Sequence, residues 1–564
     1  MKILFVSAAL AFTTATFAQE YQPYWSAPAY EMSVEDSLFL DQLSNDTFNW
    51  FWEKAHSATG LSPDRSTDFS TQNSHISIAS VGFGLTAYGI GAELGYVSRA
   101  QAAERVDKTL RALLLGKMGK ESTGTVGYRG WYYHFLNANT LERAWTSELS
   151  SIDTALMMLG VIFVRNYFDD AENDLETAIR DSATVILDRV DWRFMRNPNT
   201  GGISGGWNPE SGFINFEYAG YNEAMLLYIL ALGGTTNPVP TSAWQFWTSR
   251  YRYETTAHFP IAFVTFAPLF GHHYPHAWID FRGLHNDELD LFGEKYDYFE
   301  NARRATYANR AYCAANPEDW PNYSESEWGL TACDGPRNFG FNGYRARGAS
   351  GNRIVDDGTI APTAAGGSIA YAPEIVIPML RNLKEKYGSK LYSTYGFRDA
   401  YNDSVNWFDT DYIGIDQGPI LMMIENYRSG WVWEVMKKDS IIQKGLIRAG
   451  FAGGWIDDIV VNVEDPEAPP KRFILWQNYP NPFNPNTTIQ FELAEASMVT
   501  LSIYNTVGQL VRTLIPSRRF GTGAHKVAWD ARDDTGKHVA GGLYFYKIKA
   551  GQHFTAQRKL ILMK

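Results

Sequence analysis

The chain has 564 residues, more than one ordinary domain, which predicts a large unit with an appendage. Apolar residues make up 45% and aromatic residues 15%, enough for a large core with aromatic side chains left to line a cleft. The formal net charge is −12, and residues 471–564 hold 13 Lys and Arg against 5 Asp and Glu, so the acidic excess lies in the remainder. An acidic body disfavours nucleic acids and anionic polysaccharides as partners, because its field repels them. A neutral glycan meets no such penalty.

The first residues, 1–18, have the pattern of a secretory signal peptide. Lys2 precedes a short apolar run, which ends in small residues before Gln19. Later apolar runs fall short of the roughly 20 residues that cross a bilayer. We therefore expect a protein that is exported through the periplasm and is secreted or displayed at the cell surface.

Residues 19–462 predict one helical domain. Several of its helical runs are apolar all round, which implies burial on both sides, and no βαβ alternation indicates a parallel sheet. About a dozen helices in two layers predict an all-α (α/α)6 toroid with a central crater ringed by helix ends and loops. The runs are 38–55, 78–94, 99–115, 152–166, 175–190, 221–232, 261–270, 289–314, 369–387 and 418–435, with weaker ones at 242–250 and 401–407.

The pattern changes after a proline-rich stretch, "VNVEDPEAPPKRF", which predicts a stiff linker at 463–472. Residues 473–564 then alternate apolar and polar side chains with a period of two. In "TTIQFEL", for example, Ile489, Phe491 and Leu493 share one face. This domain is expected to be a small all-β Ig-like sandwich of about seven strands.

The chain contains two cysteines, Cys313 and Cys333. Export favours a disulfide that closes the loop between them, and two separately buried thiols are the alternative. Their spacing matches no metal-binding signature, and neither a metal nor another cofactor is expected.

Acidic residues collect where apolar helices begin. In "TSELSSIDTALMMLGVIF", Ser150 and Asp153 have the spacing of a capping box, with Glu148 just outside the helix. In "GYNEAMLLYILAL", Glu223 follows a possible cap at Asn222, and in "YIGIDQGPILMMIENY", Asp416 is itself a possible cap. Taken singly, each acid is best explained as a helix cap worth about 1 kcal/mol. Taken together, inner helices that run the same way would aim these carboxylates into one crater.

Glycoside hydrolysis generally requires two facing carboxyl groups. One is protonated and assists the leaving oxygen, and the other is ionised and activates water. In an inverting enzyme the two carboxyl groups lie about 6.5–9.5 Å apart. Glu223 has the drier surroundings and is expected to be the acid. Asp416, beside Gln417 and Gly418, is expected to be the ionised partner. Asp153 completes the catalytic candidates.

Flat aromatic faces and polar side chains in Gly-rich or loop-like stretches suit pyranose rings. Single tryptophans usually pack in a core, but several of them lie in connections between helices. Histidines near 272–276 lack the spacing of a zinc motif and are expected to bond sugar hydroxyls or to be structural. The expected substrate-binding residues are Glu148, Trp131, Trp207, Tyr221, His276, Trp278, Asp280, Arg282 and Gln417.

Four ordered motifs, "SELSSIDTALMMLG", "GYNEAMLLYILALG", "HHYPHAWIDFRG" and "IGIDQGPILMMIENYRSG", resemble the glucoamylase-like domain of bacterial endo-β-1,2-glucanases, glycoside hydrolase family 144. The resemblance covers residues 35–452. It implies an (α/α)6 barrel that hydrolyses β-1,2-glucan to sophorooligosaccharides with inversion, with Glu223 as acid and Asp416 as base. Glu148 and Asp153 would be further acids of the pocket, and Asp153 competes with Asp416 for the role of base.

The tail has a resemblance of its own. "LWQNYPNPFNPNTTIQFEL", "SIYNTVGQLVRTL" and "WDARDDTGKHVAGGLYFYKIKA" are similar to the C-terminal sorting domain of the type IX secretion system. This implies the secretion machinery as a partner. A carbohydrate-binding module is the rival interpretation, and it is disfavoured because the tail contains only Trp476 and Trp529.

Two other functions compete with an inverting hydrolase, which we expect to be a monomer acting on a neutral β-glucan. Toroids also host polysaccharide lyases, for which Tyr274, His276 and Arg282 could supply the chemistry, although the acidic body argues against a uronate polymer. In a non-catalytic glycan-binding surface protein, the acids would merely cap helices.

Overall fold

The computed structural model describes residues 21–459 and 473–563, apart from 71–73, 294, 338–342, 351–352, 494–496, 521–522 and 552–553. The chain divides into two compact units, Met1–Val463 and Glu464–Lys564. The signal-peptide prediction and the linker prediction lie outside the described residues.

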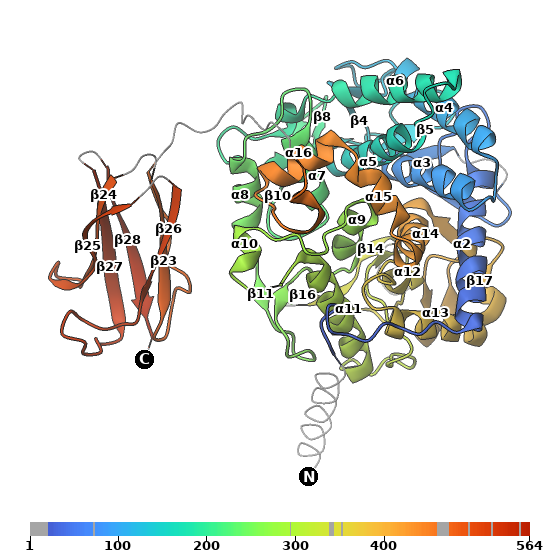
Figure 1. Ribbon diagram of the computed structural model, residues 1–564. Helices are drawn as coiled ribbons and strands as arrows, with labels where there is room; N and C mark the ends of the chain where they lie inside the picture. The colour runs from blue at the N-terminus through green and yellow to red at the C-terminus, as the bar shows by residue number, and fades with distance from the viewer. Residues whose placement is uncertain are drawn as a thin grey trace, which may run out of the picture. The chain divides into compact units, whose positions relative to one another are not determined.

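The larger unit is built from helices joined by loops that carry short strand pairs (Figure 1). Its helices are α2 (Val34–Lys54), α3 (Ile78–Glu93), α4 (Arg99–Leu115), α5 (Ser151–Tyr167), α6 (Asp174–Asp188), α7 (Met225–Gly233), α8 (Ser242–Thr248), α9 (Phe270–Trp278), α10 (Asp287–Asp290), α11 (Tyr298–Ala315), α12 (Pro362–Gly366), α13 (Pro373–Tyr387), α14 (Gly414–Arg428), α15 (Trp431–Lys437) and α16 (Ser440–Arg448).

The most apolar of these helices contact one another in a closed sequence. Helix α3 packs on α5, α5 on α7, α7 on α9, α9 on α14, and α14 back on α3, while α12 also packs on α14. Every residue of α7 is buried, as expected of a helix that has apolar side chains on all sides. Helices such as α4 and α6 lie against these inner helices and keep one polar face.

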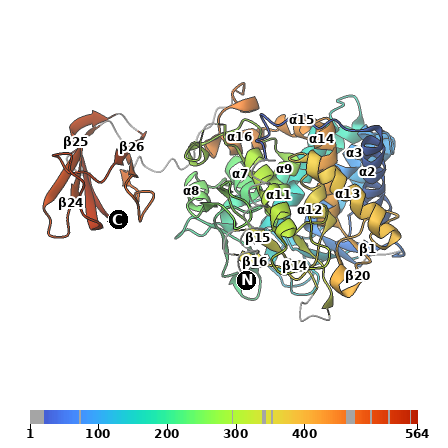
Figure 2. The ribbon, with the colours of Figure 1, turned by 90° about the horizontal axis from the view of Figure 1, so that it is seen from below.

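Short antiparallel strand pairs lead into several inner helices. Strand β2 (His75–Ser77) runs directly into α3, β6 (Leu149–Ser150) into α5, and β21 (Asp411–Ile413) into α14. In Figure 2, the labelled strands β1 (Arg65–Thr67), β14 (Arg345–Ala346), β15 (Gly348–Ser350), β16 (Arg353–Val355) and β20 (Trp407–Phe408) gather at one end of the helices. The larger unit therefore has a loop-and-strand face, and α3, α5 and α14 begin there.

Several predicted helices are wrong in whole or in part. In the run 289–314 helix α11 begins only at Tyr298, and the run 418–435 is divided between α14 and α15. Residues 261–270 contain β12 (Phe263–Val264) rather than a helix, because Pro268 lacks a backbone N–H and disfavours helical geometry before it. Residues 401–407 form a strand and a single 3-10 turn, which ends at left-handed Asn406. Helix α7 begins at Met225 rather than at 221, because the Asn222 side chain accepts a hydrogen bond from the Ala224 N–H and holds a turn there.

The smaller unit contains seven strands in two antiparallel sheets, as the alternating pattern predicts. One sheet has the order β22 (Ile474–Leu475), β23 (Thr487–Leu493), β26 (Gly523–Trp529). The other has the order β25 (Leu510–Phe520), β24 (Ser497–Tyr504), β27 (Gly542–Ala550), β28 (Phe554–Leu562). Ile489, Phe491 and Leu493 are all buried in its core.

The favoured disulfide is wrong, because both cysteines are free and buried. Cys313 packs inside α11 in one apolar cluster, whereas Cys333 lies in another cluster beside Arg347. Among the described residues, no helix combines the length and apolar character that a membrane span requires.

Close contact between α3 and α5 depends on two glycines. A Cβ atom at Gly160 would lie 2.2 Å from the carbonyl oxygen of Gly82, which belongs to the facing backbone. We expect Gly160→Ala to lower the free energy of unfolding by about 1–3 kcal/mol, because the two helices must separate. Urea unfolding checks this, with Thr184→Ala on the exposed face of α6 as the control. Equal stability of both variants would contradict the prediction.

Candidate active site

Three of the predicted acids lie where inner helices begin. Asp153 is in the first turn of α5, Glu223 is in the turn that precedes α7, and Asp416 is in the first turn of α14. Ser150 caps α5 as predicted, with its hydroxyl accepting a hydrogen bond from the Asp153 N–H at 3.2 Å. The predicted cap at Asp416 is wrong, since α14 already begins at Gly414.

One oxygen of the Glu223 carboxyl group is held out of water without a partner. Its Oε2 atom is buried and makes no hydrogen bond within the described structure. Burial raises the pKa of Glu223 to about 7; the negative charge of Asp153 adds to this, and a backbone hydrogen bond opposes it. Glu223 therefore carries a proton in a large fraction of molecules near neutral pH, as an acid catalyst requires.

Asp416 lies in a drier and more acidic place than its sequence neighbours indicate. It is 2% exposed, and its Oδ2 atom lacks a hydrogen-bond partner in the described structure. Burial raises the pKa of Asp416 to about 8; the charge of Asp334 adds to the effect and that of Arg65 opposes it. Its polar company is not Gln417, which donates its amide to the Phe397 carbonyl, but Asp399, which bonds to Asp416 and has its own pKa raised by burial and by Asp416.

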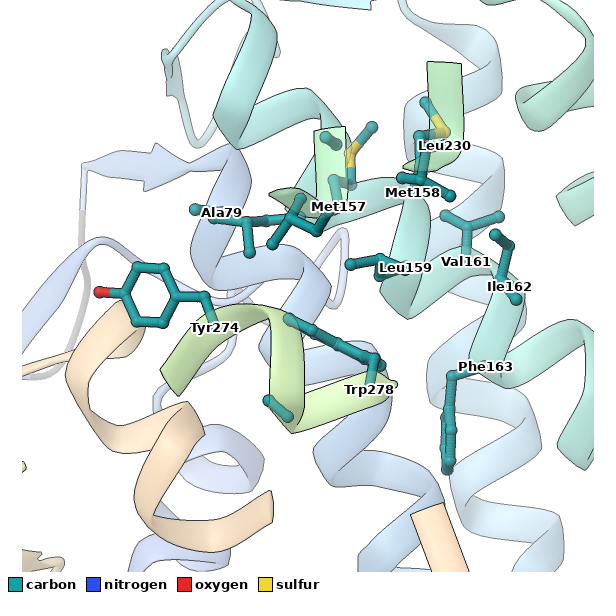
Figure 3. Packing of buried hydrophobic residues seen from close by; sticks show 14 of the residues in the cluster. Ala79, Met157, Met158, Leu159, Val161, Ile162, Phe163, Leu230, Tyr274 and Trp278 are labelled. Carbon is teal, nitrogen blue, oxygen red and sulfur yellow. The ribbon is translucent and has the colours of Figure 1, made fainter. Parts of the chain in front are cut away.

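Tyr274 on α9 lies among these three carboxyl groups. Burial, followed by the negative charges of Asp416, Glu223 and Asp153, raises the pKa of its phenol well above the usual value. Its hydroxyl lacks a hydrogen-bond partner in the described structure. Figure 3 shows this hydroxyl pointing away from the apolar side chains of the core. The structure therefore gathers Asp153, Glu223 and Asp416, from three different helix starts, near the Tyr274 side chain, and this buried cluster is called the hollow.

Asp153 differs from the other two acids because it has a cationic neighbour, His134, a residue that the sequence reasoning did not select. His134 Nε2 lies 3.6 Å from Asp153 Oδ2, and His134 Nδ1 lies 3.0 Å from Glu148 Oε1. Burial lowers the pKa of His134, but the charges of Asp153 and Glu148 outweigh it and raise the pKa to about 9. His134 is therefore charged at neutral pH. No local sequence signal marks it, because the pairing forms only in the folded chain.

Two groups of side chains have potential metal-ligand atoms within 4.8 Å of one another: His134, Glu148 and Asp153, and Asp334, Asp409 and Asp411. Each group already contains or contacts a protein cation. In the first group this is charged His134 itself, and in the second Arg65 Nη1 lies 2.6 Å from Asp334 Oδ2. The donors fit a hard cation chemically, but the protein's own charges partly satisfy them.

A cavity of about 1030 Å³ opens beside the turn that carries Glu223. Tyr221 and Asn222, the two residues that precede Glu223, line it, as do Ser204 and Ser350. Tyr221 is 4% exposed, so only an edge of its ring is available to a ligand. The volume accommodates several sugar rings.

Two of the predicted aromatic platforms are core residues instead. Trp131 and Trp278 are completely buried, and their indole N–H groups donate to the Asp191 carbonyl and to Thr86 Oγ1. Neither ring can stack on a sugar in this structure. Trp207 is 7% exposed and packs against Tyr128, so it offers at most an edge.

The "HHYPHAWIDFRG" residues do not act together. His276 is fully buried, and burial lowers its pKa to about 3, so it is neutral and sealed from any ligand. Asp280 pairs with Arg282 at 2.8 Å and with Lys437 at 3.0 Å, beyond the end of α9. Because Lys437 belongs to α15, which follows α14, this cluster lies at the opposite end of α14 from Asp416. Asp280 and Arg282 therefore do not line the hollow, and the residues proposed for a lyase are not assembled.

Residues 215–440 match the family described as "Putative glucoamylase". A solved structure from Bacteroides uniformis, described as a putative glucoamylase, is 32% identical over 76% of this chain and 100% of its own, with a TM-score of 0.67. The chain belongs to the glucoamylase-like family.

Other relatives are named glycoside hydrolases. An exo-β-1,2-glucooligosaccharide sophorohydrolase from Parabacteroides distasonis is 29% identical over 75% of this chain, and the matched part spans 58% of that relative's length. An endo-β-1,2-glucanase from Chitinophaga pinensis, solved with sophorotriose and glucose, is 27% identical over 74% of this chain and 99% of its own, with a TM-score of 0.66. In the smaller unit, residues 482–553 match the FlgD Ig-like domain.

The charge on His134 is directly measurable. We expect its imidazole to titrate near pH 9, and Asp153→Asn to bring the midpoint at least one unit closer to 6.5, because an opposing charge is lost. Since this pKa is raised by folding, the contact stabilises the protein fully below about pH 6.5 and loses that effect as the pH rises through 9. NMR of histidine-labelled protein checks the midpoint, with Asp290→Asn as the control. A wild-type midpoint near 6.5 would disprove the assignment.

Proposed function

We propose that the chain is a glycoside hydrolase that cleaves β-1,2-linked glucan to sophorooligosaccharides. The observation that carries this proposal is the pair of buried carboxyl oxygens, Glu223 Oε2 and Asp416 Oδ2, which lack a partner in the described structure and belong to groups near Tyr274. The names of the relatives supply the linkage, and the family supplies the reaction class. The larger unit, with its closed sequence of inner helices, would be an (α/α)6 toroid whose crater holds the bond to be cleaved.

In this proposal Glu223 protonates the leaving glycosidic oxygen. Its pKa of about 7 leaves the proton in place at neutral pH while still permitting transfer, which is the balance that general acid catalysis favours. Tyr274 would direct its free hydroxyl toward the sugar and fix the orientation of the bond.

Asp416 is proposed as the base that activates water on the opposite face of the sugar, so that the anomeric configuration inverts. Burial and the charge of Asp416 raise the pKa of Asp399, whereas a hydrogen bond from Asp399 lowers the pKa of Asp416 against the effect of its burial. Asp416 is then the member of the pair that ionises. A water, or a substrate hydroxyl that relays the proton, would bond to its free Oδ2.

Asp153 and Glu148, tied to charged His134, are proposed to bind sugar hydroxyls beside the acid. The hydrogen bond and charge of His134 lower the pKa of Glu148 against the effect of its burial, and a carboxylate accepts hydrogen bonds from sugar hydroxyl groups. Asp153 remains the alternative base, since it adjoins Glu223 closely enough to affect its pKa.

The smaller unit is proposed to direct the protein out of the cell. Its strands match the FlgD Ig-like domain, and Trp529 is 1% exposed, so its ring offers no flat surface to a glycan. We propose recognition by the type IX secretion machinery after removal of residues 1–18. The enzyme would then act as a monomer outside the cell or at its surface.

The catalytic assignment predicts large losses from conservative changes. We expect Glu223→Gln and Asp416→Asn each to lower kcat/KM on linear β-1,2-glucan by about 10²–10⁴-fold with the melting temperature retained, because each removes one proton-transfer group. Reducing-end assays with chromatography of the products measure this and also separate endo from exo action. Glu434→Gln, on exposed α15, is the matched control. Near-normal rates in both variants would remove the two acids from the chemistry.

The pH profile tests which acid is the base. Glu223 must keep its proton, so kcat/KM falls as the pH rises through about 7, whereas Asp416 must lose its proton, so kcat/KM rises as the pH approaches about 8. We therefore expect a narrow bell with its maximum between pH 7 and 8. If the acidic limb instead lies below pH 6 and Asp153→Asn eliminates it, Asp153 is the base.

A further inference from the structure

The cavity beside Glu223 is lined by an unusual number of cations for so acidic a protein. Four arginines reach it from three separate segments, whereas the acidic side chains in its wall are Glu217 and Glu254. One arginine follows the turn after α6, two lie in the segment between α8 and strand β11 (Tyr253–Glu254), and one begins β16. They are Arg196, Arg250, Arg252 and Arg353.

These guanidinium groups are not engaged by the protein. None of the four donates a side-chain hydrogen bond or forms an ion pair among the described residues; Arg250 has only the ring of Phe246, 5.5 Å away. The Nε atom of Arg196 is buried without a partner. Arginines elsewhere in the larger unit, such as Arg347, are paired with carboxylates. Arg250, Arg252 and Arg353 are exposed, so water satisfies their donors in the free protein and all three are available to a ligand.

The two acids of the cavity do not neutralise these cations. Glu217 accepts hydrogen bonds from Asn197 and, at 2.7 Å, from Thr200 Oγ1. Glu254 accepts from Thr265 Oγ1 at 3.1 Å. The wall thus keeps an excess of two positive charges.

A second feature of the wall also calls for a ligand. Ser350 is 8% exposed, and its hydroxyl is buried without a hydrogen-bond partner. Ser350 faces Arg353 across the β15–β16 hairpin, so an unpaired hydroxyl and an unpaired guanidinium come from the same turn. Together they present adjacent donors of the kind that hold a phosphate or carboxylate.

The position of the cavity relates it to the reacting bond. Tyr221 and Asn222 line it, and Glu223 follows directly. A glucan held with its scissile bond at Glu223 would therefore extend into the cavity. Its neutral hydroxyl groups need donors and acceptors but no net charge, so they do not account for four unpaired arginines.

The overall charge of −12 does not prevent an anion from binding here. Exposed charges more than about 8 Å apart are largely screened at physiological salt, whereas guanidinium groups act at hydrogen-bond distance. The acidic body slows the approach of an anion, and the local cations hold it.

We propose that this cavity binds an anionic substituent, a phosphate or carboxylate ester group, carried by the glucan chain near the bond that is cleaved. The inference rests on the proposed function and deepens it, because it names the class of substituted substrate. It also revises the expectation that anionic polysaccharides are excluded.

The test compares three β-1,2-linked glucopentaoses: one unsubstituted, one with a phosphate monoester, and one with a succinate half-ester on a primary hydroxyl. We expect wild-type kcat/KM to be about tenfold higher on a substituted chain at low salt, and the preference to shrink at 0.5 M salt. A preference for the phosphate chain, for the succinate chain or for both would identify which anionic group the cavity binds. Equal rates on all three chains would overturn the proposal.

Variants then locate the preference. Arg252→Gln combined with Arg353→Gln should reduce the substituted-to-unsubstituted ratio to near one, whereas Arg111→Gln, on the exposed face of α4, should leave it unchanged. Melting temperatures confirm that these surface variants fold. If the paired variant lowers both rates equally, the arginines bind the neutral chain and the proposal fails.

Calorimetric binding to Glu223→Gln separates this inference from the catalytic proposal. Tighter binding of a substituted pentaose, lost in the arginine variant, supports the anion site even if wild type hydrolyses none of the three chains. Equal binding of all three chains overturns the anion site while leaving any hydrolysis of neutral β-1,2-glucan intact.

Discussion

The removal of carboxyl groups from water at helix starts is the constraint on which the rest of the site depends. A closed sequence of inner helices must be apolar, so an acid at the beginning of such a helix is surrounded by hydrocarbon. The partial positive charge of a helix N-terminus softens the cost but does not abolish it. Glu223 and Asp416 therefore hold protons at pH values where ordinary carboxylic acids are ionised. The architecture that closes the core also supplies a neutral acid.

The same hollow treats its acids unequally. Asp153 has charged His134 and the Ser150 hydroxyl, whereas Glu223 and Asp416 each keep one oxygen without a partner. Asp153 has a cation beside it. Glu223 and Asp416 have pKa values near neutral, so these two can exchange protons there. Division of labour among identical chemical groups thus follows from which neighbours the fold provides.

Local pattern predicted the elements well and the partnerships poorly. Helix 99–115 has the observed bounds, and the acids at helix starts share one hollow, because apolar periodicity and cap spacing are local properties. His134 and Asp399 were invisible, since their partners are distant in sequence. Trp131 and Trp278 were misassigned because a tryptophan in a loop-like stretch resembles a sugar platform until its N–H finds a buried acceptor. Asp280 was misassigned because it is close in sequence to Tyr274, although helix α9 separates the two residues and places Asp280 beside Lys437.

The net charge of the chain is likewise a poor guide to the charge inside a cavity. A negative net charge predicts that the protein repels anions at long range. This holds far from the surface, where the positions of single charged side chains no longer matter. Within a cavity the sign of the charge is set by the few side chains that reach it, and here three separate segments contribute four arginines. No window of sequence contains all four, so no composition count reveals their meeting. Specificity for a charged group can therefore coexist with an opposite net charge, because the two act over different distances.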